Sequence, residues 1–280
     1  MPTYNEKSSF TAQGLVLRRM LWTDLPLSRE IFDAFEKIHP ATAADWQFIK
    51  DSPFVPTFEV RYRMTDRILA QKGIKQIFEL ASGLSPRGLV MAAADPACTF
   101  VEVDLPDEIA LKRAVIGNLV TAGAIKSPGK NFQLLEGSVI EEKVFAKAAA
   151  LFREEPVAVV CEGLLRYLSF DDKTILVQHV YNLLKKFGGV WITPDIESLD
   201  NRQQTLSRQT PGMRGVDVEK NIFPTLDAAR EYFEGFGFTI QATPLADMVG
   251  ECVSPRKYGL TPEQAVELLD GRTMFTMTVE

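Results

Sequence analysis

Cysteine and histidine are scarce in this sequence. Its 280 residues include three cysteines, Cys98, Cys161 and Cys252, and two histidines, His39 and His179. The cysteines are odd in number, widely spaced and without a Cys-x-x-Cys pair, which argues against a disulfide framework or a zinc site. Free thiols are typical of a reducing compartment, so we expect a cytoplasmic protein. With so few histidines, no Ser-His-Asp or Cys-His arrangement can be assembled.

Long apolar runs and an excess of positive charge are also missing. No apolar stretch approaches the ~20 residues of a membrane-spanning helix, and residues 1–10 lack the segments of a secretory signal. The formal net charge is -6, with 46% apolar and 24% charged residues. This composition is typical of soluble globular proteins. We therefore expect no nucleic-acid or membrane partner.

The hydrophobic pattern divides the chain into two parts. Residues 1–72 are predicted to form a helical N-terminal extension, with helices over Thr11–Leu21, Ser28–Ile38 and Phe58–Gln71 and an irregular stretch over His39–Pro56. From Lys75 onward, short apolar runs alternate with helical segments, which is typical of a parallel sheet built from βα units. The predicted strands of this alternation are Ile77–Ala81, Phe100–Leu105, Phe132–Leu135, Val157–Cys161 and Val190–Pro194. The helices predicted with them are Leu84–Ala94, Asp107–Ala122, Glu141–Glu154 and Asp171–Phe187.

The second part, residues 73–280, is predicted to carry an insertion before its last strands. The polar stretch Ser198–Phe223 is expected to be a loop or lid. Beyond it, the pattern predicts helices over Leu226–Phe236 and Pro262–Leu269 and strands over Thr239–Pro244 and Thr273–Val279. The count is then about seven strands in one functional unit.

The first predicted strand runs into a turn of small residues, Ala81-Ser82-Gly83-Leu84-Ser85-Pro86, followed by a helix. Gly83 can adopt positive φ, and a helix start offers free N–H groups and a positive dipole end. Doubly wound folds bind nucleotides at such a turn. The pattern is not Gly-x-Gly-x-x-Gly, and an ordinary βα turn is the alternative interpretation.

Two carboxylates follow apolar strands. Asp104 lies 21 residues after Gly83, where dinucleotide-binding folds hold ribose hydroxyls; its alternative duty is a helix N-cap. Glu162 ends the strand Val157–Cys161, and burying an acid without a duty is costly, which favours a functional role. Tyr167 either lines the same pocket or belongs to the core.

These motifs resemble those of the leucine carboxyl methyltransferase family, and within it bacterial O-methyltransferases of the tetracenomycin-pathway type. The most specific stretch is Glu162-Gly163-Leu164-Leu165-Arg166-Tyr167-Leu168, supported by Glu102-Val103-Asp104-Leu105-Pro106 and by Arg61-x-Arg63. The resemblance covers roughly Thr11–Val279. It implies a class I methyltransferase fold: a Rossmann-like α/β structure whose seven-stranded, mostly parallel sheet has an antiparallel last strand.

The resemblance also implies a site for S-adenosylmethionine (SAM). Arg61 would hold the SAM carboxylate, with Arg19 as a second candidate. The methionine moiety would pass Glu79, Ala81 and Gly83, the ribose would meet Asp104 and Leu105, and Ser138 and Val139 would flank the adenine. Glu162 would lie near the methionine end or the methyl group. The chain departs from the family's usual Gly-Ala-Gly-Leu-Asp-Thr-Arg turn, and it has Ser138 where the family often has Asp.

The expected function is therefore methyl transfer from SAM to an oxygen, carboxylate or hydroxyl, of a small molecule, with a polyketide-like compound as the candidate acceptor. Glu162, Tyr167 and Asp195 are the candidates for a general base. The alternatives are methylation of a protein's terminal carboxylate, a nicotinamide-dependent oxidoreductase, and a SAM-binding module without catalysis. No metal is expected, and the protein is predicted to be a monomer or a homodimer.

Overall fold

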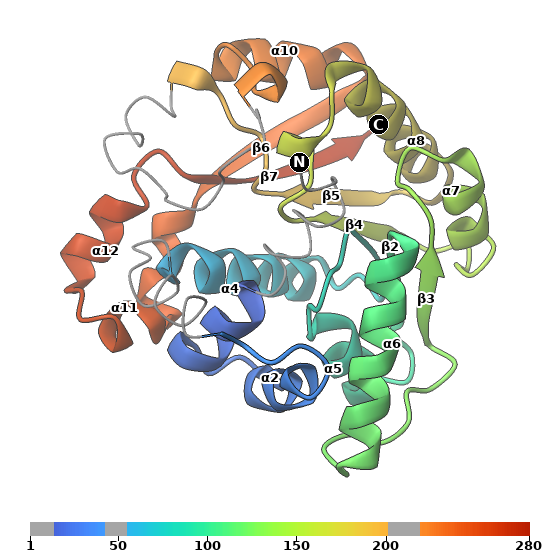
Figure 1. The fold of residues 1–280 in the computed structure, drawn as a ribbon. Coiled ribbons are helices and arrows are strands. Elements are labelled where there is room, and N and C mark those ends of the chain that lie inside the picture. The colour runs from blue at the N-terminus through green and yellow to red at the C-terminus, as the bar shows by residue number, and fades with distance from the viewer. Residues whose placement is uncertain (1–13, 43–54, 201–218) are drawn as a thin grey trace.

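A single seven-stranded sheet organises the molecule (Figure 1). The computed structural model describes residues 14–42, 55–200 and 219–280. The strands are β1 (Gln76–Leu80), β2 (Thr99–Asp104), β3 (Phe132–Glu136), β4 (Val157–Cys161), β5 (Gly189–Thr193), β6 (Phe238–Pro244) and β7 (Thr273–Val279). Their order is β3-β2-β1-β4-β5-β7-β6, with β1 to β5 parallel and β7 antiparallel to both of its neighbours. The predicted sheet and its antiparallel last strand are confirmed.

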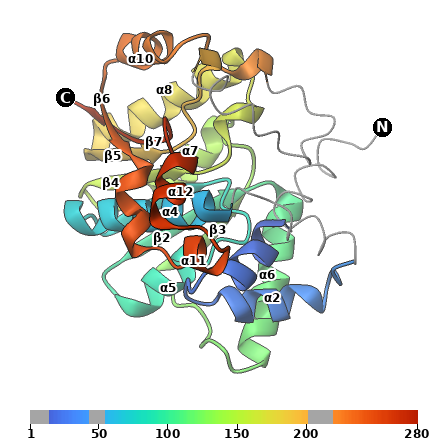
Figure 2. The same cartoon turned by 90° about the vertical axis from the view of Figure 1, so that its left-hand side faces the viewer.

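Helices cover both faces of the sheet (Figures 1 and 2). One layer holds a helix over residues 14–22 together with α2 (Ser28–Glu36), α4 (Val55–Lys72), α5 (Arg87–Ala94) and α6 (Pro106–Thr121). The opposite layer holds α7 (Glu142–Ala149), α8 (Phe170–Phe187) and α10 (Leu226–Gly235). Two short helices, α11 (Ser254–Lys257) and α12 (Pro262–Leu268), lie against the first layer, as does the 3-10 helix η3 (Leu245–Glu251).

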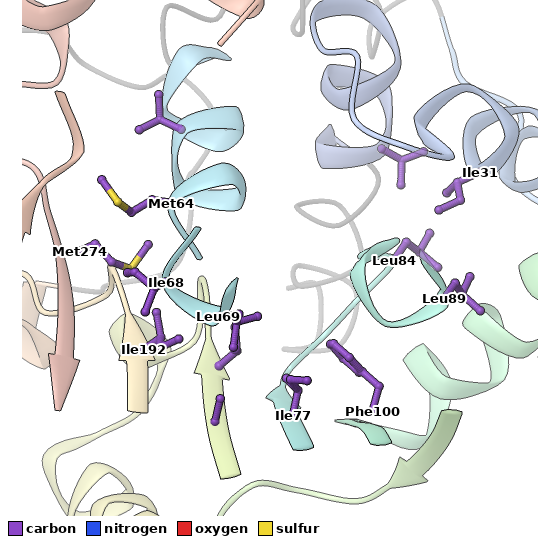
Figure 3. Close-up of a cluster of buried hydrophobic side chains, with 14 of the residues drawn as sticks. Ile31, Met64, Ile68, Leu69, Ile77, Leu84, Leu89, Phe100, Ile192 and Met274 are labelled. Carbon is purple, nitrogen blue, oxygen red and sulfur yellow. The ribbon is translucent and has the colours of Figure 1, made fainter. Parts of the chain in front are cut away.

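The central strands are buried on both faces because both helix layers pack on them. Every residue of β1 and β4 is buried, and successive side chains alternate between two hydrophobic clusters. Ile77 joins the cluster under α4, whereas Phe78 joins the one under α7 and α8. Figure 3 shows the first cluster, in which Ile68 of α4 lies next to the sheet residue Ile192 and Met64 lies next to Met274. Helix α4, predicted to belong to an N-terminal extension, is thus part of the central core.

Three boundaries differ from the prediction for identifiable reasons. α5 begins at Arg87 instead of Leu84, because residues 81–86 form an irregular turn. α7 ends at Ala149 instead of Glu154, because the chain turns and buries Phe152 in the second cluster. α4 already begins at Val55, since Pro56 is compatible with a first helical turn. The elements η3 and α11 were not predicted.

The insertion predicted over Ser198–Phe223 is described only at its two ends. Ser198 and Phe223 form a parallel bridge, and the Leu199 N–H donates to the Phe223 carbonyl at 2.9 Å. The 3-10 helix η2 (Glu219–Asn221) precedes the bridge on its return side. Residues 201–218, on which most of the lid prediction falls, lie outside the described residues.

Candidate functional site: the carboxyl edge of the sheet

The carboxyl ends of β1, β2 and β4 meet at one edge of the sheet, with β1 between the other two. The strand order reverses between β1 and β4, because β2 and β3 lie on one side of β1 while β4 and β5 lie on the other. Open α/β sheets bind ligands at this switch point. Most of the residues singled out from the sequence follow these three strands, so the topology gathers them at one place.

The turn after β1 is shaped by two left-handed residues. Ala81 has φ 51° and Gly83 has φ 49°. The Ser82 N–H donates to the Val103 carbonyl at 3.3 Å, which ties the turn to the end of β2. Glycine adopts this conformation freely, whereas alanine pays a steric cost of about 1–2 kcal/mol. Such strain is often found at functional sites.

Asp104 connects the turn to the neighbouring strand. Its Oδ2 accepts the Gly83 N–H at 2.7 Å, and its Oδ1 accepts the Leu105 N–H at 2.8 Å. The alternative N-cap role is wrong, because α6 begins with Pro106 and has no side-chain cap. Burial raises the pKa of Asp104 even though both N–H bonds favour its ionised form. The carboxylate keeps further acceptor capacity for a diol, and its ribose role stays a prediction.

A buried ion pair lies beneath the turn. Lys112 of α6 pairs with Glu102 of β2, and its Nζ also donates to the Ser85 carbonyl at 3.1 Å. Both side chains are almost fully buried. Burial raises the pKa of Glu102 to about 7, against the opposing effect of Lys112. The sequence analysis did not identify this pair, although an acid inside an apolar strand was a signal for it.

Arg87, the first residue of α5, is the centre of a larger ionic cluster. Its side chain is 1% exposed and contacts three carboxylates: Nε to Asp66 at 2.8 Å, one terminal nitrogen to Glu79 at 2.6 Å, and the other to Glu162 at 2.7 Å. The guanidinium also stacks on the Tyr62 ring, 4.3 Å from its centroid. Arg87 was not a predicted site residue, and the cluster joins α4, β1, β4 and α5.

Glu162 is an ionised carboxylate with one oxygen engaged. Its Oε1 accepts bonds from Arg87 and from the Thr65 hydroxyl at 3.0 Å. Burial pushes the pKa of Glu162 upward, but Arg87 outweighs this effect, aided by Arg61 and Arg19, and the pKa lies below its usual value. Among the described residues none donates a hydrogen bond to Oε2. The site therefore presents a fixed negative charge at the end of β4.

The two arginines of the Arg-x-Arg segment have different surroundings. Arg63 pairs with Asp24 and, at 2.8 Å, with the buried Glu59. Among the described residues, the ion-pair partner of Glu59 is Arg63 and the ion-pair partner of Asp66 is Arg87.

Arg61 itself lies close enough to Glu162 to lower that group's pKa. Its Nε is buried, and within the described part of the chain this nitrogen has no hydrogen-bond partner. Arg19 instead donates to the Leu84 carbonyl of the turn at 3.2 Å. Arg61 is therefore a guanidinium near Glu162 whose buried Nε has no partner in the described part of the chain.

The remaining predicted residues occupy the flanks of the edge. Ser138 and Val139 follow β3, and the Val139 side chain is buried in the second core cluster, so only its backbone could face a ligand. Tyr167 ends the 3-10 helix η1 (Leu165–Tyr167) and is partly buried. Their predicted roles stay predictions.

Asp195, a candidate base, accepts the N–H groups of three consecutive residues after Glu162, at 2.8, 2.6 and 3.3 Å. Its carboxylate fixes the loop after β4, which is a different duty from proton transfer.

The described residues contain no group of His, Cys, Asp and Glu side chains that could hold a metal ion. In the same residues no helix is long and apolar enough to span a membrane.

The chain resembles known methyltransferases in sequence and in fold. The sequence model of the family described as "Leucine carboxyl methyltransferase" matches residues 21–181, more than half of the chain. A DUF574 family protein from Streptomyces avermitilis superposes with a TM-score of 0.56 at 14% identity, covering 96% of this chain and 97% of that one. A second similar structure is a chain of the complex between the Haloferax volcanii Trm112 methyltransferase activator and a putative methyltransferase. It superposes with a TM-score of 0.52 at 15% identity, covering 79% of this chain and 90% of that one. No curated protein matches significantly.

The strand order, the antiparallel β7 and the polar edge define a class I SAM-dependent methyltransferase fold. The chain belongs to the leucine carboxyl methyltransferase family. Its cofactor is accordingly SAM. The residues at the edge fit this cofactor, because Arg61 has an orphaned buried donor for a carboxylate and Glu162 has an ionised oxygen for a positive group.

Proposed function

We propose that this protein transfers the methyl group of SAM to an oxygen of a small molecule, with a polyketide-like acid or phenol as the acceptor. The observation that carries the proposal is the pairing of opposite charges at the end of β4. Glu162 is ionised with Oε2 unbound by described residues, and Arg61 beside it has a buried donor without a described partner. Such a pair matches the ammonium and carboxylate of an amino acid.

The donor site extends along the strand ends. Arg61 would hold the SAM carboxylate and Glu162 its positively charged amino group. Asp104 would hold the ribose, and the backbone after β3, at Ser138 and Val139, would border the adenine. The left-handed residues Ala81 and Gly83 support this proposal, because they hold the turn close to the end of β2.

When bound, SAM supplies an activated methyl group on a sulfonium, which an acceptor oxygen attacks in line. The protein's contribution is then mainly alignment of donor and acceptor, which can lower the barrier by about 7–11 kcal/mol. The fixed negative charge of Glu162 favours a cationic donor over its neutral product. The tie between Asp104 and Gly83 fixes the position of the turn against which the donor would lie.

The state of the carboxylates supports an acidic oxygen as the acceptor. Asp66, Glu79 and Glu162 are each bound to Arg87, and Asp195 is occupied by backbone N–H groups. The pKa of Glu162 lies below its usual value, so this carboxylate is a weak base, and the other three are held in structural contacts. A carboxylate acceptor needs no base, and for a phenol the candidate base is Tyr167.

Turnover with methyl-labelled SAM tests the proposal. The acceptors to compare are aromatic polyketide-like acids, their phenolic analogues without the acid, and a peptide with a C-terminal leucine carboxylate. Label in a small-molecule product supports the proposal, and base treatment separates the esters, which release methanol, from the stable ethers. Label only in the peptide would contradict the small-molecule acceptor. Label only on amines would contradict oxygen transfer.

A further inference from the structure

Arg87 occupies a position that local structure alone disfavours. It is the first residue of α5, where the helix dipole is positive, and its side chain is 1% exposed. A buried cation at a helix N-terminus is unfavourable unless tertiary partners compensate it. The compensation comes from carboxylates of three other elements. Arg87 therefore helps to fix the relative positions of these elements and does not stabilise its own helix.

The guanidinium engages a different carboxylate along each of its edges. Nε faces Asp66 of α4, and the two terminal nitrogens face Glu79 of β1 and Glu162 at the end of β4. The planar fork has fixed donor directions, so it also fixes the relative positions of its three acceptors. The Tyr62 ring below the plane restricts the remaining rotation. An ammonium group could not span the three.

We propose that Arg87 is a positioning residue of the donor site, which holds Glu162 by Oε1 so that Oε2 remains available to the amino group of the cofactor. Arg87 need not touch the cofactor in this role. The inference rests on the proposed function, because it assigns the Oε2 side of Glu162 to SAM. It adds a residue that acts through Glu162, and it explains why an acid in a mostly buried position stays ionised.

Several charged and titratable groups act on Glu162. They come from α4, α5, β1, β4 and the helix over residues 14–22, and they are Arg61, Asp66, Arg87, Glu79, Cys161 and Arg19. Among the groups that lower the pKa of Glu162, Arg87 is the largest, and it acts against burial. If Arg87 loses its contact with Glu162, burial prevails and the carboxyl gains a proton at a higher pH.

The test measures S-adenosylhomocysteine binding by calorimetry from pH 8 to pH 5. Other acids also titrate in this range, so their effect must be cancelled. For this purpose Glu162→Gln is introduced into each background, and its dissociation constant is divided by that of the same background with Glu162 intact, here called the parent. In the wild-type background the ratio should stay constant across the range. In the Arg87→Lys background the parent should bind about tenfold more weakly at pH 8, the value expected for a lost charge-assisted bond. Its ratio should then fall toward one as the pH decreases.

Thr65→Val is the matched control, because it removes a neutral donor to the same Oε1. It should weaken binding only slightly and leave the ratio independent of pH. An Arg87→Lys ratio that stays constant, or a wild-type ratio that already falls between pH 8 and pH 5, would overturn the positioning role. If Arg87→Lys does not fold, the wild-type ratio still tests the role, because its fall between pH 8 and pH 5 would refute it. Failure of the wild-type protein to bind S-adenosylhomocysteine at any pH would instead refute the proposed function.

Discussion

Replacing Arg61 with methionine separates cofactor binding from stability. Arg61 Nε has no partner among the described residues, so its removal leaves no acceptor among them without a hydrogen bond. We expect the free energy of unfolding to change by less than about 1 kcal/mol. If Arg61 holds the SAM carboxylate, the lost charge-assisted bonds cost about 1.5–3 kcal/mol, which is roughly a 10- to 150-fold weaker affinity.

The assay is calorimetric titration with SAM and with decarboxylated SAM, which lacks the carboxylate. Arg61→Met should weaken SAM alone, whereas decarboxylated SAM should bind the variant and the wild type equally. Arg63→Met, on the same helix, is the matched control. It removes the partner of the buried Glu59, so it should reduce stability by about 1–3 kcal/mol without changing either affinity. Equal losses for both ligands with Arg61→Met, or no loss for either, would refute the anchoring role.

Three further predictions follow from the turn and its support. Asp104→Asn should weaken S-adenosylhomocysteine binding about tenfold in a folded protein, and an unchanged dissociation constant would place the ribose elsewhere. Ala81→Gly should relieve the strain at φ 51° and stabilise the protein by up to about 1 kcal/mol, and a lower Tm would contradict that reasoning. Glu102 has a pKa of about 7 in the folded protein and a lower one when unfolded, so its contribution to stability is present at pH 4 and decreases as the pH rises through 7. Denaturant titrations between pH 5 and pH 8 should show this slope, and the Glu102→Gln Lys112→Met double variant should lack it.

The sequence was sufficient for the sheet because its signals are local. Apolar runs of about five residues, separated by helical stretches, located every strand, and the spacing from Gly83 to Asp104 located two residues that form a hydrogen bond. The family resemblance supplied the antiparallel last strand and the prediction for Arg61. Where local signals were ambiguous, as at the end of α7, the burial of a single side chain, Phe152, decided the boundary.

The ionic clusters could not be predicted, because their partners are far apart in the chain. Arg87 lies 75 residues from Glu162 and 21 from Asp66. Arg61 and Arg63 also look equivalent in the sequence. The structure distinguishes them, because Arg63 pairs with Glu59 whereas Arg61 lies near Glu162. The available signal was indirect: Glu79 and Glu102 lie within apolar strands and required buried cations.

The central claim is that the edge formed by β1, β2 and β4 is a SAM site, and its most direct test is a paired titration with S-adenosylhomocysteine and NADH. The wild-type protein should bind one S-adenosylhomocysteine per chain, with a raised Tm, and should not bind NADH. The Asp104→Asn Glu162→Gln double variant should lose at least about a hundredfold in affinity, since both changed groups would contact the ligand. Binding of NADH without S-adenosylhomocysteine, or full affinity in the folded double variant, would contradict the account.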